Sequence, residues 1–186
     1  MRYFKKIEGE RVYLSPINPD DAEVYAKWIN DFSISLRLGQ AVNVYSLQSE
    51  RTALENMAKE GHNYAIILRD SNELIGNCSL FSINYISRTA TIGLFIGEEC
   101  YRSKGLGTEV IQLLVEYGFK VLNLNNIMLQ VFEFNLLAIK CYEKAGFHTF
   151  GRRTSSCCIN STYYDELFME ILPKDLKSTY LDKILP

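Results

Sequence analysis

The residues best suited to chemistry in this 186-residue chain form a cationic, glycine-bearing run at positions 102–107. The run is Arg102-Ser103-Lys104-Gly105-Leu106-Gly107. Glycine lets the backbone curl closely around an anion, and the first turn of a helix offers unpaired N–H donors at the positive end of its dipole. Arg102 and Lys104 add positive charge. The run therefore suits a pyrophosphate, although two glycines alone also fit an ordinary turn into a helix.

Two common phosphate-binding motifs do not match this run. A Walker loop would need Lys-Ser/Thr after its last glycine, and Gly107 is followed by Thr108 and Glu109. A dinucleotide-binding fingerprint would need a third glycine and a suitably placed acidic residue after the next strand. The pyrophosphate interpretation consequently needs support from the rest of the chain.

Hydrophobic periodicity predicts the elements that must position this run. Strands are expected at residues 11–15, 64–68, 74–85, 89–96, 127–132, 147–153 and 162–172. Helices are expected after a capping Asn18 and at residues 47–59, 106–122 and 136–145. The last two strands should form a hairpin through residues 155–161, and the tail is expected to add one helical turn. We therefore expect an α/β (α+β) fold with a mixed, mostly antiparallel seven-stranded sheet, helices on both faces and a right-handed parallel crossover spanning residues 89–132.

Composition limits the class of protein. The chain is 47% hydrophobic and 23% charged, has a net charge of -2, and contains no linker or repeat, so we expect a single domain over residues 1–186. A basic stripe for nucleic acid and a run of roughly 20 apolar residues for a membrane are both missing from the sequence. The basic start has no apolar region behind it, which predicts a cytoplasmic protein without a signal peptide. Five irregularly spaced cysteines and the isolated His62 and His148 predict neither a disulfide framework nor a metal site.

Two motifs together resemble the GNAT superfamily of N-acetyltransferases. The first is Arg102-x-x-Gly105-x-Gly107, and the second is Asn135-x-x-Ala138-x-x-x-Tyr142-Glu143-Lys144-x-Gly146-Phe147. Further marks resemble the branch of ribosomal-protein and polyamine acetyltransferases: Arg11-Val12-Tyr13-Leu14-x-Pro16, Trp28-x-Asn30-Asp31, Ile92-Gly93 and Tyr163-Tyr164-Asp165. The resemblance covers nearly the whole chain, and the order of expected elements agrees with that fold.

The resemblance implies acetyl-CoA as co-substrate, with no metal. The strand at 89–96 would splay from the strand at 127–132, and the gap would admit the pantetheine arm. The residues that would bind it are Leu94, Phe95, Ile96, Arg102, Ser103, Lys104, Gly105, Leu106, Gly107, Thr108, Asn135 and Tyr142. A backbone N–H of the 94–96 segment would act as oxyanion donor, and the amine would attack the thioester directly.

The same resemblance implies a general acid but leaves the base open. Tyr142 would protonate the departing thiolate, and Asn135 would bond the cofactor arm, cap a helix, or do both. Thr91 stands where the related branch often has Glu, so the obvious base is missing. Glu133 is our first substitute, with Asp165, Glu98 or a water chain as alternatives, and each of these carboxylates could equally be a solvated surface group.

The acceptor is expected to be a primary amine on a small molecule or at a protein N-terminus. Its candidate binding residues are Trp28, Asn30, Tyr164 and Asp165, because aromatic rings with a few acids suit a cation. Trp28 and the tyrosines are also ordinary core candidates. Homodimerisation through the exposed sheet stays open. The alternative function is a non-catalytic sensor domain that binds CoA or an amine, which the missing Glu at Thr91 would favour.

Overall fold

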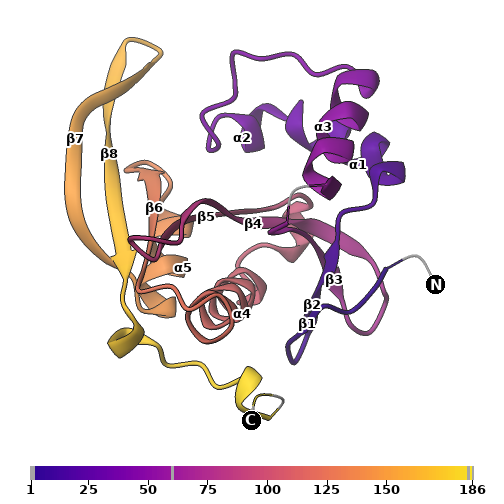
Figure 1. Cartoon of the computed structure of the whole chain (residues 1–186). Coiled ribbons are helices and arrows are strands. Elements are labelled where there is room, and N and C mark those ends of the chain that lie inside the picture. Colours follow the sequence, from indigo (N-terminus) through magenta and orange to yellow (C-terminus); the bar gives the residue numbers. More distant parts are fainter. Residues whose placement is uncertain (1–2, 60, 184, 186) are drawn as a thin grey trace.

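The computed structural model describes residues 3–59, 61–183 and 185, and Figure 1 shows its helices and strands in their order along the chain. The strands are β1 (Ile7–Glu8), β2 (Val12–Pro16), β3 (Asn63–Leu68), β4 (Leu74–Asn84), β5 (Thr89–Ile96), β6 (Asn126–Phe132), β7 (His148–Ile159) and β8 (Thr162–Ile171). The α-helices are α1 (Ala22–Ile29), α2 (Phe32–Ser35), α3 (Leu47–Lys59), α4 (Leu106–Lys120) and α5 (Leu136–Ala145). Short 3-10 turns are η1 (Pro19–Asp21), η2 (Glu99–Tyr101), η3 (Pro173–Asp175) and η4 (Leu181–Lys183).

Within the described residues, eight strands form one sheet in the order β1-β2-β3-β4-β5-β6-β8-β7. All neighbouring pairs are antiparallel except β5 and β6, which are joined through α4 and are parallel. This confirms the mixed, mostly antiparallel sheet and its parallel crossover. The expected count of seven strands was one too low, because β1 has only two residues and is too short to produce a period-2 pattern.

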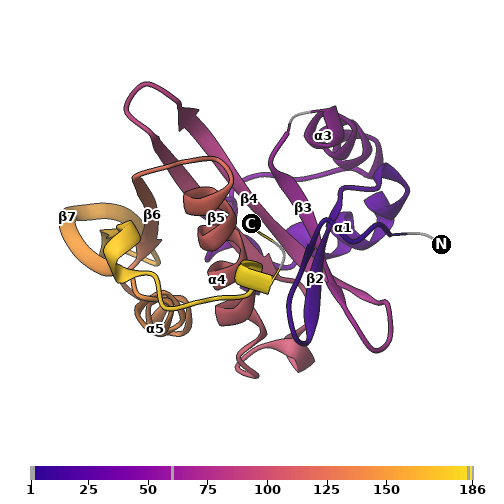
Figure 2. The same cartoon turned by 60° about the horizontal axis from the view of Figure 1, so that its bottom comes forward.

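Alternation along the strands divides the core between the two faces of the sheet. Val12 and Leu14 belong to the cluster that contains the buried side of α4, whereas Tyr13 between them belongs to the cluster formed with α1 and α3. Successive strand side chains point to opposite faces, so both faces need a cover. The predicted helices on both faces are thereby confirmed, with α4 on one face and α1 and α3 on the other (Figure 2).

Local sequence explains where several elements begin and end. The Asn18 side chain accepts a hydrogen bond of 3.1 Å from the Asp20 backbone N–H, and Pro19 occupies the first turn, as the sequence predicts. The α5 helix ends at Gly146, which has φ = 109° and satisfies the last carbonyls of the helix. These two signals fix the start of the segment that leads into α1 and the end of α5.

The β7–β8 hairpin differs in length from the prediction. Strand β7 continues to Ile159, and the turn consists of Asn160 and Ser161, both with positive φ. The expected loop at 155–161 therefore shrinks to two residues, because Cys157, Cys158 and Ile159 pair with β8 beyond an irregularity between Arg153 and Cys157. Figure 1 shows the resulting long hairpin on the side of the sheet opposite to β1 and β2.

The C-terminal segment is fixed across α4 (Figure 2). The Glu116 carboxylate accepts hydrogen bonds from the backbone N–H groups of Tyr180 (2.9 Å) and Leu181 (3.0 Å). Lys120 lies one turn further along α4 and donates to Glu116 at 2.7 Å. The expected helical turn in the tail is confirmed by η4, and this buried carboxylate is the reason that the tail follows the helix.

Candidate active site

Strands β5 and β6 separate part-way along their length. Their parallel pairing ends at Thr91 and Met128, although β5 continues to Ile96 and β6 to Phe132. Beyond Thr91, β5 remains paired with β4 only, so its other edge presents unpaired backbone groups within the described part of the chain. An extended ligand can hydrogen-bond to such an edge like an additional strand.

A cleft of about 520 Å³ opens where the two strands separate. Its walls come from α2 and the residues after it, from β5, from the loop and first turn of α4, and from α5. The predicted cofactor residues that line it are Leu94, Phe95, Ile96, Arg102, Ser103, Gly105, Gly107, Thr108, Asn135 and Tyr142. Lys104 and Leu106 belong to the same loop without lining the cleft. The structure thus brings together residues that are up to 48 positions apart, from Leu94 to Tyr142.

The loop before α4 has the backbone of an anion-binding turn. Ser103 and Gly105 have φ values of 59° and 80°, and Gly105 is the N-cap residue of α4. No side chain caps this helix, so the N–H groups of its first turn are directed toward the cleft end without a side-chain partner. A Cβ at Gly107 would lie 3.3 Å from the Cys141 sulfur, so the close approach of α5 also depends on glycine here.

Arg11 and Glu109 hold this loop against β2. The Arg11 guanidinium donates to the Lys104 carbonyl at 2.8 Å and to the Glu109 carboxylate at 2.9 Å. Glu109 is 3% exposed and also accepts from the backbone N–H groups of Arg11 (2.8 Å) and Val12 (3.3 Å). Arg11 is recognisable in the sequence only as part of a family mark, whereas in the structure it supports the loop.

The Arg102 side chain is not free to bind a phosphate with all its donors, because part of it already bonds the backbone. Its guanidinium donates to the backbone carbonyls of Ile96 (3.1 Å) and Gly97 (2.7 Å), and it still lines the cleft. It therefore connects the end of β5 to the start of the loop while bringing a positive charge to the cleft. Lys104 points toward the Tyr101 ring, with its ammonium 5.9 Å from the ring centre.

Further cations in the cleft were missed from the sequence. Arg37, Lys140 and Lys144 all line it, against one lining carboxylate, Glu99. Lys140 and Lys144 are four residues apart on α5, so their common face could have been recognised from helical spacing. Arg37 follows α2, a helix of four residues that is too short to give a periodic signal. The excess of positive charge suits an anionic ligand with several phosphate groups.

Tyr142 and Asn135 occupy opposite ends of α5. Tyr142 is 7% exposed, its ring packs edge-on against Phe147 at 5.8 Å, and burial raises the pKa of its hydroxyl. Asn135 is the N-cap of α5, and its side chain accepts a hydrogen bond of 3.4 Å from the Ala138 N–H. Both side chains line the cleft. Tyr142 is thus a neutral O–H donor across the physiological pH range, and Asn135 has a capping role besides any contact with a ligand.

Cys141 packs against the phosphate loop. Its sulfur lies 3.3 Å from the Thr108 hydroxyl, and burial raises the pKa of its thiol. A thiol that is held protonated is a poor nucleophile. This favours the packing interpretation of Cys141 over a covalent acyl-enzyme.

The three carboxylates considered as a base are each engaged. Glu133 accepts from the Asp165 backbone N–H at 2.8 Å and lies 3.7 Å from Arg152. Asp165 accepts from Arg152 at 2.9 Å. Glu98 accepts from Lys27 at 2.7 Å, and these contacts lower its pKa, with the Lys27 and Trp28 hydrogen bonds as the first causes. None of the three is among the residues that line the described cleft.

The candidate acceptor residues are divided between the core and the rim. Trp28 is 2% exposed and donates to Glu98 at 3.0 Å. Its ring lies so close to the backbone of Gly97 that a Cβ added at Gly97 would be 2.1 Å from it. The Asn30 side-chain amide donates to the Tyr45 carbonyl oxygen at 2.8 Å and accepts from the Tyr45 backbone N–H at 3.1 Å. Both therefore support the segment around α2 and β5.

Tyr164 does not line the cleft and lies on β8, two residues before Glu166, the partner of Phe132 at the carboxyl end of β6. Its ring contacts Phe134 edge-on at 5.1 Å, and Phe134 stacks on Phe132 at 5.3 Å. Phe132 in turn lies 3.3 Å from the position of a Cβ on Gly39, in the segment after α2. These contacts place an aromatic group beside the cleft, between the α2 segment and the β7–β8 hairpin.

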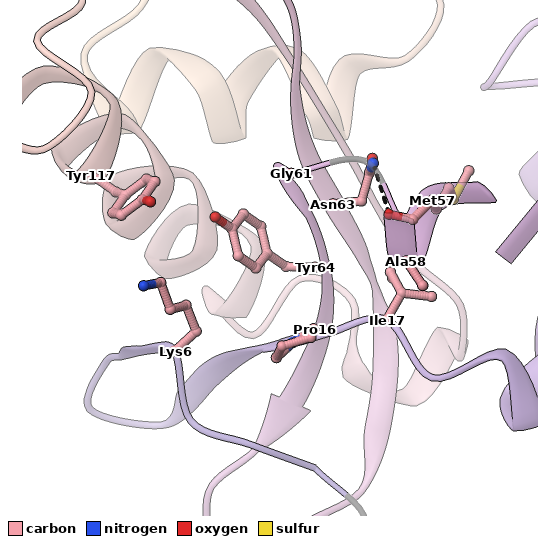
Figure 3. A pocket seen from close by; sticks show the side chains of 9 residues that line it. All are labelled: Lys6, Pro16, Ile17, Met57, Ala58, Gly61, Asn63, Tyr64 and Tyr117. Atoms are coloured by element: carbon pink, nitrogen blue, oxygen red, sulfur yellow. Dashed lines mark hydrogen bonds between the residues drawn. The ribbon is translucent and has the colours of Figure 1, made fainter. Parts of the chain in front are cut away.

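A second, smaller cavity of about 290 Å³ lies between the start of β3, the end of α3 and α4. Figure 3 shows the Lys6 side chain and the rings of Tyr64 and Tyr117 directed toward the same space. None of the residues predicted to act in catalysis or binding lines it. In the described residues, no cluster of three or more metal-binding side chains occurs, and no helix is long and apolar enough to cross a membrane.

Comparison with known proteins gives consistent matches. The sequence model of the family described as "Acetyltransferase (GNAT) domain" matches residues 11–148. The probable N-acetyltransferase YjcK of Bacillus subtilis is 30% identical over 178 residues, which cover 91% of this chain and 98% of that protein. A spermidine N(1)-acetyltransferase of Vibrio cholerae is 36% identical over 110 residues, 59% of this chain and 61% of that protein. The crystal structure of spermidine N-acetyltransferase from Vibrio cholerae in complex with CoA and spermine superposes with a TM-score of 0.78 at 25% identity, covering 93% of this chain and 99% of that chain.

Proposed function

The chain belongs to the GNAT acetyltransferase family and is an acetyl-CoA-dependent N-acetyltransferase, and on that premise we propose that the β5–β6 cleft is where it joins the two substrates. The observation that carries this proposal is the separation of β5 and β6 after Thr91 and Met128. It leaves a cleft with an unpaired strand edge along one side and an uncapped helix start at one end. These are the two features that an extended amide-containing arm and a pyrophosphate require.

The backbone of β5 and the first turn of α4 divide the binding of acetyl-CoA between them. The free edge at Leu94, Phe95 and Ile96 pairs with the pantetheine amides, and the N–H groups near Gly105 and Gly107 receive the pyrophosphate. Arg37, Arg102, Lys140 and Lys144 balance the negative charge of the phosphates. One N–H of the β5 edge also donates to the thioester oxygen, which becomes negative as the amine attacks.

Tyr142 supplies the proton that the departing sulfur needs. The amine nitrogen forms a bond to the acetyl carbon, the carbon–sulfur bond breaks, and the electron pair leaves on sulfur. The Tyr142 hydroxyl lines the cleft and is held neutral by burial, so it can protonate that sulfur without first gaining a proton itself. Direct attack needs no covalent intermediate on the protein, which agrees with the packed position of Cys141.

The amine proton leaves through Glu133 in this proposal. Glu133 directly follows β6, outside the residues that line the cleft, and accepts the Asp165 N–H with one oxygen. Its second oxygen is only loosely paired with Arg152 at 3.7 Å, so it is free to accept a proton through a water molecule. The acceptor itself is a small-molecule amine or a protein N-terminal amine, and one relative is named for the small-molecule amine spermidine.

The cytoplasm is the compartment that we assign to the protein. The five cysteines are free in the structure, which agrees with a reducing environment. The chain has no regularly spaced cysteine pairs that would require oxidation to fold.

Release of free CoA with a panel of amines tests the proposed function. We expect acetyl-CoA to raise the melting temperature and at least one amine to release CoA at a rate above hydrolysis. NAD and ATP should leave the melting temperature unchanged. Stabilisation by ATP equal to that by acetyl-CoA would show that the loop binds phosphates in general, and absence of turnover with every amine would contradict the proposed reaction.

A further inference from the structure

The smaller cavity lies at one end of the sheet, where Pro16 at the end of β2 pairs with Tyr64 near the start of β3. Its walls come from both sides of the sheet. Ile17 and Met57 belong to the apolar cluster of α1 and α3, whereas Tyr64 and Tyr117 belong to the cluster of α4. With about 290 Å³ the cavity is close to the lower size of small-molecule sites, and it shares no lining residue with the β5–β6 cleft.

Lys6 is the only charged side chain among the described residues that line this cavity. It forms no ion pair within the described part of the chain, whereas the neighbouring Lys5 is paired with Glu8 at 3.2 Å. Figure 3 shows Lys6 directed toward the same space as the two tyrosine rings. An ammonium without a partner at the mouth of a cavity attracts one negative charge, and a cationic ligand would find no carboxylate here.

The two tyrosine hydroxyls add neutral donors to this charge. Tyr64 is 4% exposed, and its ring meets the Tyr117 ring edge-on at 6.4 Å. Burial raises the pKa of Tyr64, and Tyr117 beside it raises this pKa further, so the hydroxyl stays protonated at neutral pH. An ammonium together with O–H donors is a group of side chains that holds a carboxylate well.

The rest of the wall is apolar. It consists of Pro16, Ile17, Met57 and Ala58, which Figure 3 shows away from the Tyr117 ring. The Asn63 side-chain amide on this wall donates to the Met57 carbonyl at 3.3 Å, so it already bonds the end of α3. A ligand that fills the cavity therefore meets a positive, hydrogen-bonding end and an apolar end.

We infer that this cavity binds a small organic acid, a monocarboxylate with an apolar body. The carboxylate lies at Lys6 and the tyrosine hydroxyls, and the body lies against Ile17 and Met57. A single cation makes this site different from the β5–β6 cleft, where four lining cations suit several phosphate groups. The inference does not depend on the proposed reaction, because no residue assigned to acetyl transfer lines the cavity.

Binding of 4-fluorophenylacetate, followed by fluorine NMR, tests the inference. The protein is first saturated with CoA, so that the cationic cleft is occupied and cannot hold the probe. We expect a dissociation constant of about 1 mM or below. The neutral 4-fluorophenylacetamide has the same shape and should bind at least about tenfold more weakly, because it lacks the charge that Lys6 attracts. Inorganic phosphate, which has no apolar body, should not displace the probe.

Two variants locate the probe on the chain. Lys6→Gln should weaken its binding about tenfold, and Tyr117→Phe should weaken it about threefold through the loss of one hydroxyl. Lys6 is exposed, so Lys6→Gln should keep the wild-type melting temperature. Lys5→Gln is the matched control, since it removes the adjacent cation, which does not line the cavity, and it should leave binding unchanged.

Four results would overturn the inference. They are the absence of probe binding to the CoA complex, equal binding in wild type and Lys6→Gln, equal binding of the acid and its amide, and displacement of the probe by inorganic phosphate. The last of these would identify a site for simple anions. Turnover of amines has no part in these measurements, so the inference and the proposed function can fail separately.

Discussion

A Cβ atom at position 107 would lie 3.3 Å from the sulfur of Cys141, so α4 and α5 meet at the turn that begins the anion-binding helix. The absence of a side chain at Gly107 allows this contact. It also leaves the N–H groups of the first turn accessible from the cleft. The packing of two helices and the binding of the co-substrate therefore depend on the same glycine.

Replacing Gly107 with valine should weaken CoA binding by about tenfold or more, because the added side chain must push the first turn of α4 away from Cys141. Calorimetric titration of CoA into the folded variant measures the change. Gly61→Ala is the control, since a Cβ there has no atom within 4 Å. Unaltered CoA affinity in Gly107→Val would show that the loop is not the binding site.

Tyr142→Phe should reduce kcat about 100-fold or more, the usual contribution of a general acid, with little change in CoA affinity. Burial raises the pKa of Tyr142, so the hydroxyl is a protonated donor at neutral pH and the loss should be seen there. Steady-state kinetics and CoA titration give the two values. Tyr163→Phe, at a tyrosine that is 65% exposed, is the matched control and should behave as wild type. Equal kcat values for Tyr142→Phe and wild type would remove Tyr142 from the mechanism.

Glu98 should make the fold sensitive to acid. Hydrogen bonds from Lys27 and Trp28 lower its pKa below the ordinary value of 4.5. A carboxylate with a lowered pKa stabilises the folded state above that value, and the stabilisation is lost as the pH falls through the folded-state pKa. The difference in melting temperature between wild type and Glu98→Gln should therefore shrink from pH 7 toward pH 3. A constant difference across this range would contradict the assignment.

Glu116 should be a major source of stability, although it does not line the cleft. Its side chain is fully buried and accepts from two backbone N–H groups of the tail and from Lys120. Hydrogen bonds to a charged group are worth about 1.5–3 kcal/mol each, so Glu116→Ala should lower the free energy of unfolding by about 3 kcal/mol or more. Urea unfolding measures this value. The exposed Glu55→Ala is the control, and equal stabilities of the two variants would show that the tail does not depend on Glu116.

The long elements could be predicted from the sequence because their periodicity repeats. Residues 106–122 showed an apolar helical face over several turns, and the structure places α4 at Leu106–Lys120. The two-residue β1 and the four-residue α2 could not be predicted, because neither spans a full period of its pattern. This matters for function, since α2 and the residues after it form one wall of the cleft.

The candidate site was predictable in its loop and in α5 but not in its electrostatics. The role of Gly105 and Gly107 in the loop could be predicted from the sequence, because glycine is the residue that a tight backbone turn favours. Arg102, in contrast, bonds backbone carbonyls at the end of β5, which no side-chain pattern encodes. The cluster of Arg152 with Glu133 and Asp165 depends on β8 lying between β6 and β7, a strand order that periodicity does not determine.

Hydrogen–deuterium exchange with and without CoA tests the central claim most directly, because it locates the ligand on the chain. If CoA binds in the cleft, it should slow exchange in peptides that contain Leu94–Ile96 and in those that contain residues 102–108. Peptides near the second cavity, around Tyr64 and Tyr117, should exchange as before. Protection confined to that second cavity, with residues 94–108 unchanged, would contradict the assignment of the β5–β6 cleft as the acetyl-CoA site.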